Sequence, residues 1–240
     1  MPICMEVFWN SIADYNLATW YFQLVFIVLA VLFALLLYFK PSARVKVAAK
    51  VFLVAQSLWI AFVYYLKFGG IREHSGVMTI FWCLVSAAWV YDLVTGYSTF
   101  QRSGRYCWLG ITMIVMSFAY PAVSLARGLS FPYITTPMIP SAVALYMLGL
   151  LMTFNRKINF FAFIFIVHWS IIAISKIVFL GIPEDVLLAL ACIPSLYIFF
   201  KGAIESGGSA SKPSPAVVKG LVMAIAVAIC ICMVVELCLN

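Results

Sequence analysis

The chain has 240 residues, of which 66% are hydrophobic and only 10% are charged. Because a soluble globular surface needs roughly a quarter of charged residues, this composition excludes a water-soluble globule and predicts an integral membrane protein in contact with the lipid bilayer. The formal net charge is +7, but the basic residues are scattered through short connecting segments and form no face that could follow phosphates. We therefore expect no nucleic-acid partner.

The first segment, residues 1–16, contains Glu6 and Asp14 but no Lys or Arg, so the basic start of a secretory signal is missing. Phe8 and Trp9 are aromatic residues of the kind that lie at membrane–water interfaces. We expect this segment to form a short interfacial helix on the outer side of the membrane.

Eight apolar runs follow along the chain. Crossing about 30 Å of hydrocarbon takes about 20 helical residues, and a backbone in lipid has to satisfy its own hydrogen bonds, so each run predicts a spanning helix. The runs lie near 17–39, 48–68, 75–97, 106–126, 139–154, 159–180, 184–203 and 216–238. The fifth run is short and follows a Pro-rich segment, and Pro140 suits its first turn. The sequence thus predicts an all-α bundle with seven core spans over residues 17–204 and a tethered eighth.

Loop charge predicts the orientation, because Lys and Arg are retained in cytoplasmic loops. Eleven of the fifteen basic residues fall on one side of the bundle, three fall on the other, and Lys176 lies within the sixth run. The eleven are Lys40, Arg44, Lys46, Lys50, Arg102, Arg105, Arg156, Lys157, Lys201, Lys212 and Lys219, and the three are Lys67, Arg72 and Arg127. This distribution places the N-terminus outside the cytoplasm, and the C-terminus too if the eighth run spans.

Residues 205–215 are rich in Ser, Gly and Pro and predict a flexible cytoplasmic linker, which sets residues 216–240 apart as a C-terminal transmembrane helix. On that helix, the small residues Gly220, Ala224 and Ala228 recur at every fourth position. Such a stripe lets two helices approach closely in lipid. The helix either docks onto its own bundle or packs against a different subunit.

With the spans placed, several short motifs within residues 5 to 204 resemble an uncharacterised bacterial family of multi-pass membrane proteins, catalogued as domain of unknown function 6064. The motifs are Asp14-Tyr15-Asn16 before Trp20, Lys40-Pro41-Ser42, Trp59 with Tyr64-Tyr65, Tyr120-Pro121, Pro137 to Pro140, Trp169-Ser170 and Leu180-Gly181-Ile182-Pro183-Glu184-Asp185. Tyr65 and Lys67 depart from the family, where a histidine and an apolar residue are more usual. The resemblance implies a bundle of bacterial type in the inner membrane, and it implies no known substrate, reaction or cofactor.

Ionisable side chains inside a membrane are candidates for function because they are expensive to place there. His168 lies near the middle of the sixth run, Ser175 shares its helical face, and Lys176 lies two turns beyond His168, about 80° off that line. This face predicts a polar pocket or a proton relay inside the bundle. Under the alternative reading, His168 bonds a neighbouring helix and Lys176 reaches outward to headgroups or to Glu184 and Asp185.

Three more polar residues lie within runs. Asp92 is near the cytoplasmic end of the third run, and we expect it to pair with Arg102 or Arg105; otherwise it is the counter-charge of a buried cation. Gln23 and Gln56 lie in adjacent helices and predict a structural hydrogen bond between them.

The sequence predicts no metal and no cofactor. One membrane histidine and scattered cysteines provide no metal-ligand spacing, and nucleophile-elbow, phosphate-loop and dinucleotide motifs are missing. A late-helix lysine with an aspartate in the third span is typical of retinal proteins, but Lys176 and Asp92 are predicted near opposite membrane faces, too far apart for a Schiff base and its counter-ion.

Three functional hypotheses follow. The chain is a non-catalytic subunit of a larger membrane complex or of a homo-oligomer, as the small-residue stripe favours. Alternatively it is a carrier for a small solute, an ion or a proton that uses the His168, Ser175 and Lys176 face, with Asp92 and Gln56 as further polar candidates. The third hypothesis is a membrane enzyme acting on a lipid or a quinone, which the scarcity of acidic residues disfavours.

Overall fold

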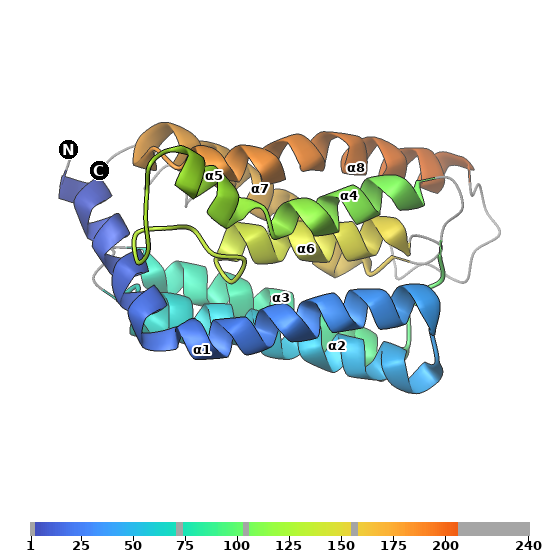
Figure 1. Cartoon of the computed structure of the whole chain (residues 1–240). Coiled ribbons are helices and arrows are strands. Elements are labelled where there is room, and N and C mark those ends of the chain that lie inside the picture. Colours follow the sequence, from blue (N-terminus) through green and yellow to red (C-terminus); the bar gives the residue numbers. More distant parts are fainter. Residues whose placement is uncertain (1–2, 71–73, 103–105, 155–157, 206–240) are drawn as a thin grey trace.

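The computed structural model describes residues 3–70, 74–102, 106–154 and 158–205, and all regular structure in these ranges is helical. The elements are α1 (Ile3–Phe39), α2 (Ala43–Leu58), the π-helix η1 (Trp59–Lys67), α3 (Ser75–Thr95), α4 (Cys107–Ser117), α5 (Tyr120–Ala126), α6 (Pro140–Thr153), α7 (Phe160–Leu180), the 3₁₀ turn η2 (Pro183–Asp185) and α8 (Val186–Glu205). The long helices lie side by side along one axis (Figure 1). The predicted all-α fold class is confirmed.

Within the described residues, four helices are long and apolar enough to cross a membrane: α1, α2 continued by η1, α3 and α7. The pair α4 and α5 passes the same test together, bent by 54° at its break, and α6 is a shorter apolar helix. Residues 216–238, the predicted eighth span, and most of the predicted linker lie outside the described residues. The count of seven spans plus one therefore stays a prediction.

Helix α1 contains both the predicted interfacial segment and the first predicted span. It runs without interruption from Ile3 to Phe39, and its N-terminal part is tilted away from the long axis of the bundle (Figure 1). The side-chain amide of Asn16 donates to the carbonyl oxygens of Pro132 at 2.7 Å and Ile134 at 2.9 Å. Residues of α1 thereby hold the Pro-rich loop before α6.

Local sequence signals account for several helix ends. The Ser42 hydroxyl accepts from the backbone N–H of Val45 at the start of α2, and the Asn159 side chain accepts from the N–H of Ala162 at the start of α7. Helix α7 ends at Gly181, whose φ of 61° is a left-handed conformation that glycine adopts without steric penalty. These caps define the α1–α2 turn and the loop that carries η2.

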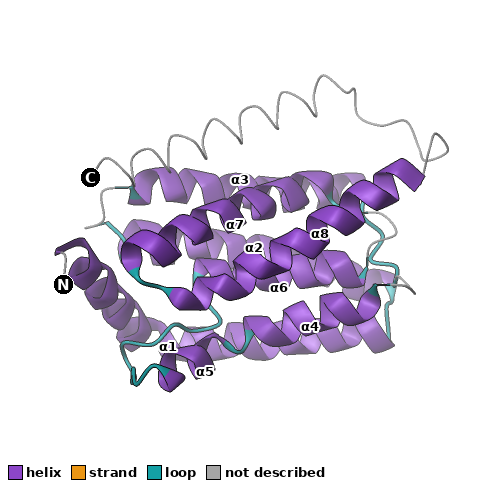
Figure 2. Ribbon diagram, turned by 90° about the horizontal axis from the view of Figure 1, so that it is seen from above, coloured by secondary structure: helices purple, strands orange, loops and turns teal. Residues whose placement is uncertain are grey.

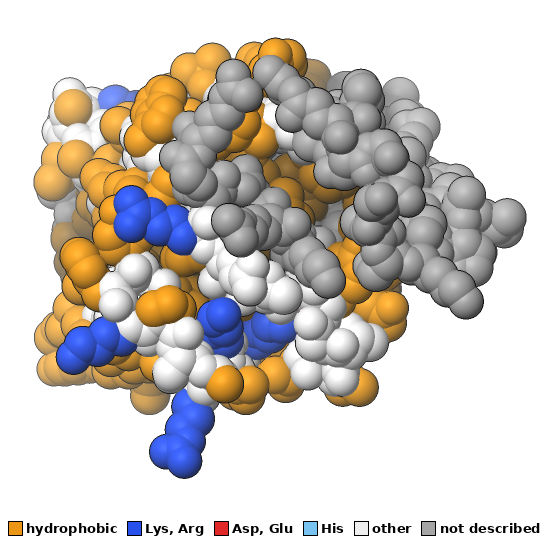
Figure 3. Space-filling view, turned by 90° about the vertical axis from the view of Figure 1, so that its right-hand side faces the viewer, with side chains coloured by type: hydrophobic (Ala, Val, Ile, Leu, Met, Phe, Trp, Pro, Cys, Tyr) orange, Lys and Arg blue, Asp and Glu red, His pale blue; other side chains and the backbone are white. Residues whose placement is uncertain are grey.

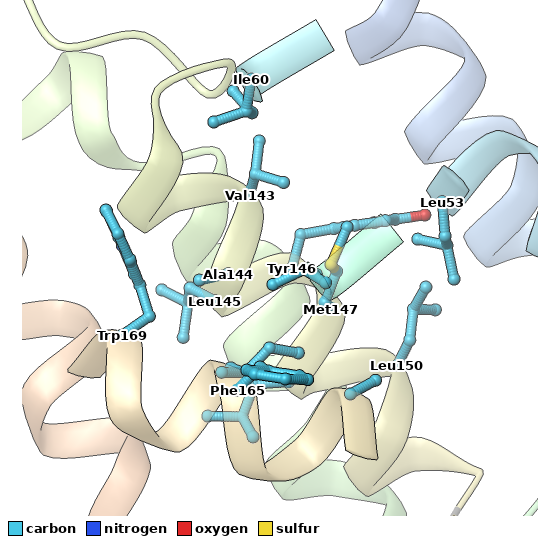
Figure 4. Close-up of a cluster of buried hydrophobic side chains, with 14 of the residues drawn as sticks. Leu53, Ile60, Val143, Ala144, Leu145, Tyr146, Met147, Leu150, Phe165 and Trp169 are labelled. Atoms are coloured by element: carbon cyan, nitrogen blue, oxygen red, sulfur yellow. The ribbon is translucent and has the colours of Figure 1, made fainter. Parts of the chain in front are cut away.

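Helix α6 is the centre of the bundle, because every one of its residues is buried. A helix that is apolar on all sides has to be surrounded by others. Its side chains meet residues of α2, η1 and α7 around it, including Leu53, Ile60 and Trp169 (Figure 4). Pro140 stands in its first turn, as predicted.

Helices α4 and α6 approach very closely at a pair of glycines. A Cβ added to Gly110 would lie 2.6 Å from the carbonyl oxygen of Gly149, and a Cβ added to Gly149 would lie 2.8 Å from the backbone nitrogen of Ile114. Small residues permit this kind of backbone approach between helices in lipid. This contact fixes α4 against the central helix.

The predicted fourth span, residues 106–126, is divided between α4 and α5. Pro121 lies in the first turn of α5, where its lack of an N–H and its ring prevent α4 from continuing through this point. The chain bends by 54° between the two helices. The bend brings the short helix α5 to the end of the bundle at which α6 begins and α7 ends (Figure 2).

Candidate functional site

A buried ion pair joins the last turns of α7 to the loop that follows it. The Lys176 ammonium lies 2.7 Å from Oδ2 of Asp185 and donates to the Ser141 hydroxyl at 3.1 Å. Lys176 is 8% exposed and Asp185 is fully buried. The predicted contact of Lys176 with Asp185 is confirmed, but the ammonium turns into the bundle and does not reach outward. Ser141 is in the first turn of α6, so this charged pair lies beside the N-terminus of the central helix.

A second ion pair lies next to the first and ties the end of α5 to the same loop. One guanidinium nitrogen of Arg127 lies 2.9 Å from both carboxylate oxygens of Glu184, and the other donates to the carbonyl oxygen of Gly181 at 3.1 Å. The Ser124 hydroxyl donates to Oε1 of Glu184 at 2.7 Å. We call Arg127, Ser124 and Glu184 the loop clamp, because they connect α5 to the α7–α8 loop.

Two buried polar atoms near these pairs have no hydrogen-bond partner among the described residues: the hydroxyl of Tyr120 and Oδ1 of Asp185. Both residues are fully buried. An unpaired buried polar group costs about 1–3 kcal/mol, so native proteins rarely keep one without a reason. We call Tyr120, Ser141, Lys176 and Asp185 the junction cluster, since they come from α5, α6, α7 and η2 where these elements meet.

The junction cluster is walled by aromatic rings. The Lys176 ammonium lies 5.6 Å from the ring centroid of Trp169, whose indole N–H donates to the Ser141 hydroxyl at 3.4 Å. Trp169 in turn packs against Tyr65 at 6.1 Å and Trp82 at 5.3 Å between ring centroids. Low polarity around the ammonium strengthens its electrostatic interactions, both with Asp185 and with the ring faces. Tyr65 thus packs against this wall.

The predicted face on α7 points into the bundle. His168 and Ser175 are 7% and 9% exposed, and Ile172 between them is fully buried. Nδ1 of His168 lies 2.7 Å from the carbonyl oxygen of Ile164, one turn earlier on the same helix. Lys176 contacts Ser141 of α6 and Asp185 of η2. The junction cluster therefore includes residues that do not lie on the predicted face of α7. A relay role for His168 stays a prediction.

Asp92 pairs with a buried cation at the opposite end of the bundle. Its Oδ2 lies 3.3 Å from the ammonium of Lys50, which also donates to the carbonyl oxygens of Asp92 and Ser98. The backbone N–H and the hydroxyl of Ser98 both donate to the Asp92 carboxylate. The preferred prediction of a pair with Arg102 is wrong, because the Arg102 guanidinium lies over the Tyr38 ring at 4.3 Å. Arg105 lies outside the described residues, and the alternative of a buried cation is confirmed.

The predicted hydrogen bond between Gln23 and Gln56 is wrong. The Gln23 amide donates within its own helix, to Oδ1 of Asn16 at 3.2 Å and to the Thr19 hydroxyl at 2.9 Å. The Gln56 amide donates to the sulfur of Met138 at 3.7 Å, in the loop before α6. Asn16 and Thr19 lie on one face of α1 and satisfy Gln23 locally, which removes its need for a partner in α2.

The predicted docking stripe of Gly220, Ala224 and Ala228 lies outside the described residues. Within the described ranges, the members of the junction cluster that the sequence did not indicate are Tyr120 and Ser141. Asp185 was named as a possible partner of Lys176, because two acids follow a span whose last turns contain a lysine. Tyr120 and Ser141 carried no such signal, because only the bend after α4 and the start of α6 bring them there.

A protein-family model matches most of the chain. The model of a family described as a family of unknown function (DUF6064) matches residues 5–209. No curated protein and no solved structure matches the chain. The match covers all of the described helices except the first two residues of α1.

Proposed function

The chain belongs to this family of unknown function, so its activity has to be inferred from its own residues, and we propose that it is a multi-pass membrane carrier for a small solute or an ion. The junction cluster is its binding site. One observation carries this proposal: a buried ion pair, Lys176 with Asp185, lies beside two buried polar atoms that have no hydrogen-bond partner among the described residues. These atoms are the Tyr120 hydroxyl oxygen and Oδ1 of Asp185.

The helix arrangement around the cluster supports transport. Carriers often place their sites at interrupted membrane helices, where helix ends and polar side chains replace the hydration of a solute. Here α4 and α5 are bent at a break, and the 14-residue helix α6 begins inside the bundle beside Lys176. Ionisable side chains within apolar spans mark solute or ion pathways for the same energetic reason.

We propose the bacterial inner membrane as the location, with the N-terminus outside, seven spans over residues 17–204 and an eighth over 216–238. The bias of Lys and Arg towards one side of the bundle supports this orientation. The end of the bundle at which α1 gives way to α2 carries Lys and Arg side chains, with no Asp or Glu visible among the coloured atoms of that face (Figure 3). The junction cluster is at the opposite end, which is the outer side in the orientation that we propose.

The test is transport by the full chain reconstituted into liposomes. Uptake is measured for a fixed panel of small solutes and ions: sodium, potassium, chloride, phosphate, an amino acid, a sugar and a dicarboxylate. We expect uptake of at least one member above protein-free liposomes, and we expect Lys176→Met to abolish it. Lys67→Met, which removes an exposed lysine at the end of η1, is the matched control and keeps the uptake.

Absence of uptake for the whole panel contradicts the carrier proposal, and equal uptake by the Lys176→Met variant contradicts the placement of its site. The variant Lys176→Met leaves Asp185 buried without a cation, so its folding is checked by size-exclusion chromatography in mild detergent before reconstitution.

A non-catalytic subunit role is the second proposal, and the stripe of Gly220, Ala224 and Ala228 on the C-terminal helix favours it. Under this proposal, the tethered helix packs against another membrane protein or a second copy of the chain. Gentle purification of a tagged chain then retains a stoichiometric partner, and Ala224→Leu releases it. A protein that stays monomeric under these conditions contradicts the subunit proposal and leaves the carrier proposal intact.

A further inference from the structure

Two adjacent acids in η2, both fully buried, have very different surroundings. Glu184 is fully engaged: both of its oxygens meet the Arg127 guanidinium, and one also accepts from Ser124. Asp185 meets the Lys176 ammonium through Oδ2 only, and Oδ1 is left without a hydrogen-bond partner among the described residues. The loop clamp is therefore complete, whereas the neighbouring ion pair keeps one open acceptor.

Building on the carrier function proposed above, we propose that Asp185 is the proton-binding group of this carrier and that the proton adds to Oδ1. In this step a lone pair of Oδ1 forms an O–H bond, and the carboxylate becomes a neutral carboxylic acid. The Lys176 ammonium keeps its three protons and loses its counter-charge. On release, the O–H bond breaks and the proton returns to water.

The charges around Asp185 favour a proton over a metal ion. Lys176 faces it from α7, Glu184 lies next to it in η2, and Tyr120 and Ser141 face it from α5 and α6. Arg127 neutralises Glu184, so the Lys176–Asp185 pair has no surplus negative charge to hold a second cation. A metal ion also needs several oxygen or nitrogen ligands, and no group of three His, Cys, Asp or Glu side chains in the described residues is placed to provide them.

Protonation of Asp185 has a structural consequence at the same site. The 2.7 Å contact between Lys176 and Asp185 connects α7 to the loop that leads into α8. A neutral Asp185 no longer attracts the ammonium as an ion, so this connection weakens while the loop clamp, with its own complete set of bonds, still holds η2 to α5. Proton binding therefore weakens the attachment of η2 to α7 and leaves its attachment to α5 intact. A proton-coupled carrier needs such a contact, whose strength depends on whether the proton is bound.

The test is pH-difference infrared spectroscopy of the full chain in lipid, which detects the carbonyl stretch of a protonated carboxylic acid. Wild type is titrated from about pH 4 to about pH 9, a range that covers carboxyl groups shifted by several pH units. We expect the pH-dependent carboxylic acid absorption to lose one component in Asp185→Asn and to keep that component in the matched control Glu184→Gln, because the other acids of the chain contribute to the spectra of all variants alike. Tyr120→Phe keeps the Asp185 carboxyl group but makes its surroundings less polar. We expect this variant to shift the titration midpoint of the Asp185 component to higher pH.

The infrared spectrum is recorded without any transport, so it tests proton binding at Asp185 independently of the carrier proposal. A spectrum of Asp185→Asn that matches that of wild type, or a wild type with no titrating band, overturns proton binding at Asp185 even if the uptake assay shows transport. A band that behaves as expected in a protein that carries no member of the panel supports Asp185 as the proton site and rejects the carrier function. If Asp185→Asn fails to fold, an unshifted midpoint in Tyr120→Phe overturns the inference.

Discussion

Substituting Gly149 by alanine tests the close packing that holds the central helix. The added Cβ would lie 2.7 Å from Cγ1 of Ile114, 2.8 Å from the backbone nitrogen of Ile114 and 2.9 Å from the carbonyl oxygen of Gly110. Two of these three atoms belong to the backbone, so no side-chain rotation relieves the overlap and α4 has to move away from α6. Overpacking of this kind costs about 3 kcal/mol at the upper end of its range, and the better helix propensity of alanine returns up to about 1 kcal/mol.

We therefore expect Gly149→Ala to lower the free energy of unfolding by about 2 kcal/mol. The assay is denaturant-induced unfolding in mixed detergent micelles, followed by tryptophan fluorescence. Gly76→Ala is the control, because a Cβ at Gly76, in the first turn of α3, meets no atom within 4 Å. A Gly149→Ala variant as stable as wild type, with Gly76→Ala also unchanged, would refute the close approach of α4 and α6.

Three further predictions use the same unfolding assay. Lys50→Met leaves the Asp92 carboxylate buried without its cation and is expected to lower stability by about 3–5 kcal/mol; an unchanged stability would mean that Lys50 is not buried against it. Arg127→Ala opens the loop clamp around the fully buried Glu184, and we expect a lower denaturant midpoint that Arg127→Lys restores only in part, because lysine cannot hold both Glu184 and the Gly181 carbonyl; full recovery with lysine would argue against this double contact. Tyr146→Phe removes a 2.8 Å hydrogen bond to a backbone carbonyl of α1 and is expected to lower stability by about 1 kcal/mol, and a more stable variant would contradict that bond.

The sequence predicted the helical architecture because apolar runs of spanning length have no alternative to helix in lipid. The starts of α3, α6 and α7 lie within a residue of the predicted runs, since Pro140 and Asn159 are local signals of helix initiation. The bend between α4 and α5 was not predicted, although Pro121 is visible in the sequence. A proline inside an apolar run also occurs in helices that continue, as Pro194 does within α8.

The candidate site was predicted only in part. Lys176 was recognised from its position in an apolar run, and its contact with Asp185 was among the expectations. Tyr120 and Ser141 could not be assigned to the site, because a tyrosine and a serine are ordinary in membrane helices and only the tertiary fold brings α5 and α6 to Lys176. Lys50 was assigned to a cytoplasmic loop because basic residues accumulate there, yet its side chain is buried and pairs with Asp92.

The most direct test of transport through the junction cluster replaces the Lys176–Asp185 pair by apolar residues of similar size, in the double variant Lys176→Met with Asp185→Leu. Exchange of a complete buried ion pair for well-packed apolar side chains is often neutral or stabilising, so folding is expected to survive. We predict that this variant is as stable as wild type in detergent and carries no member of the solute and ion panel after reconstitution. A folded double variant that transports at the wild-type rate would show that the junction cluster is a structural contact and would contradict its role as the binding site.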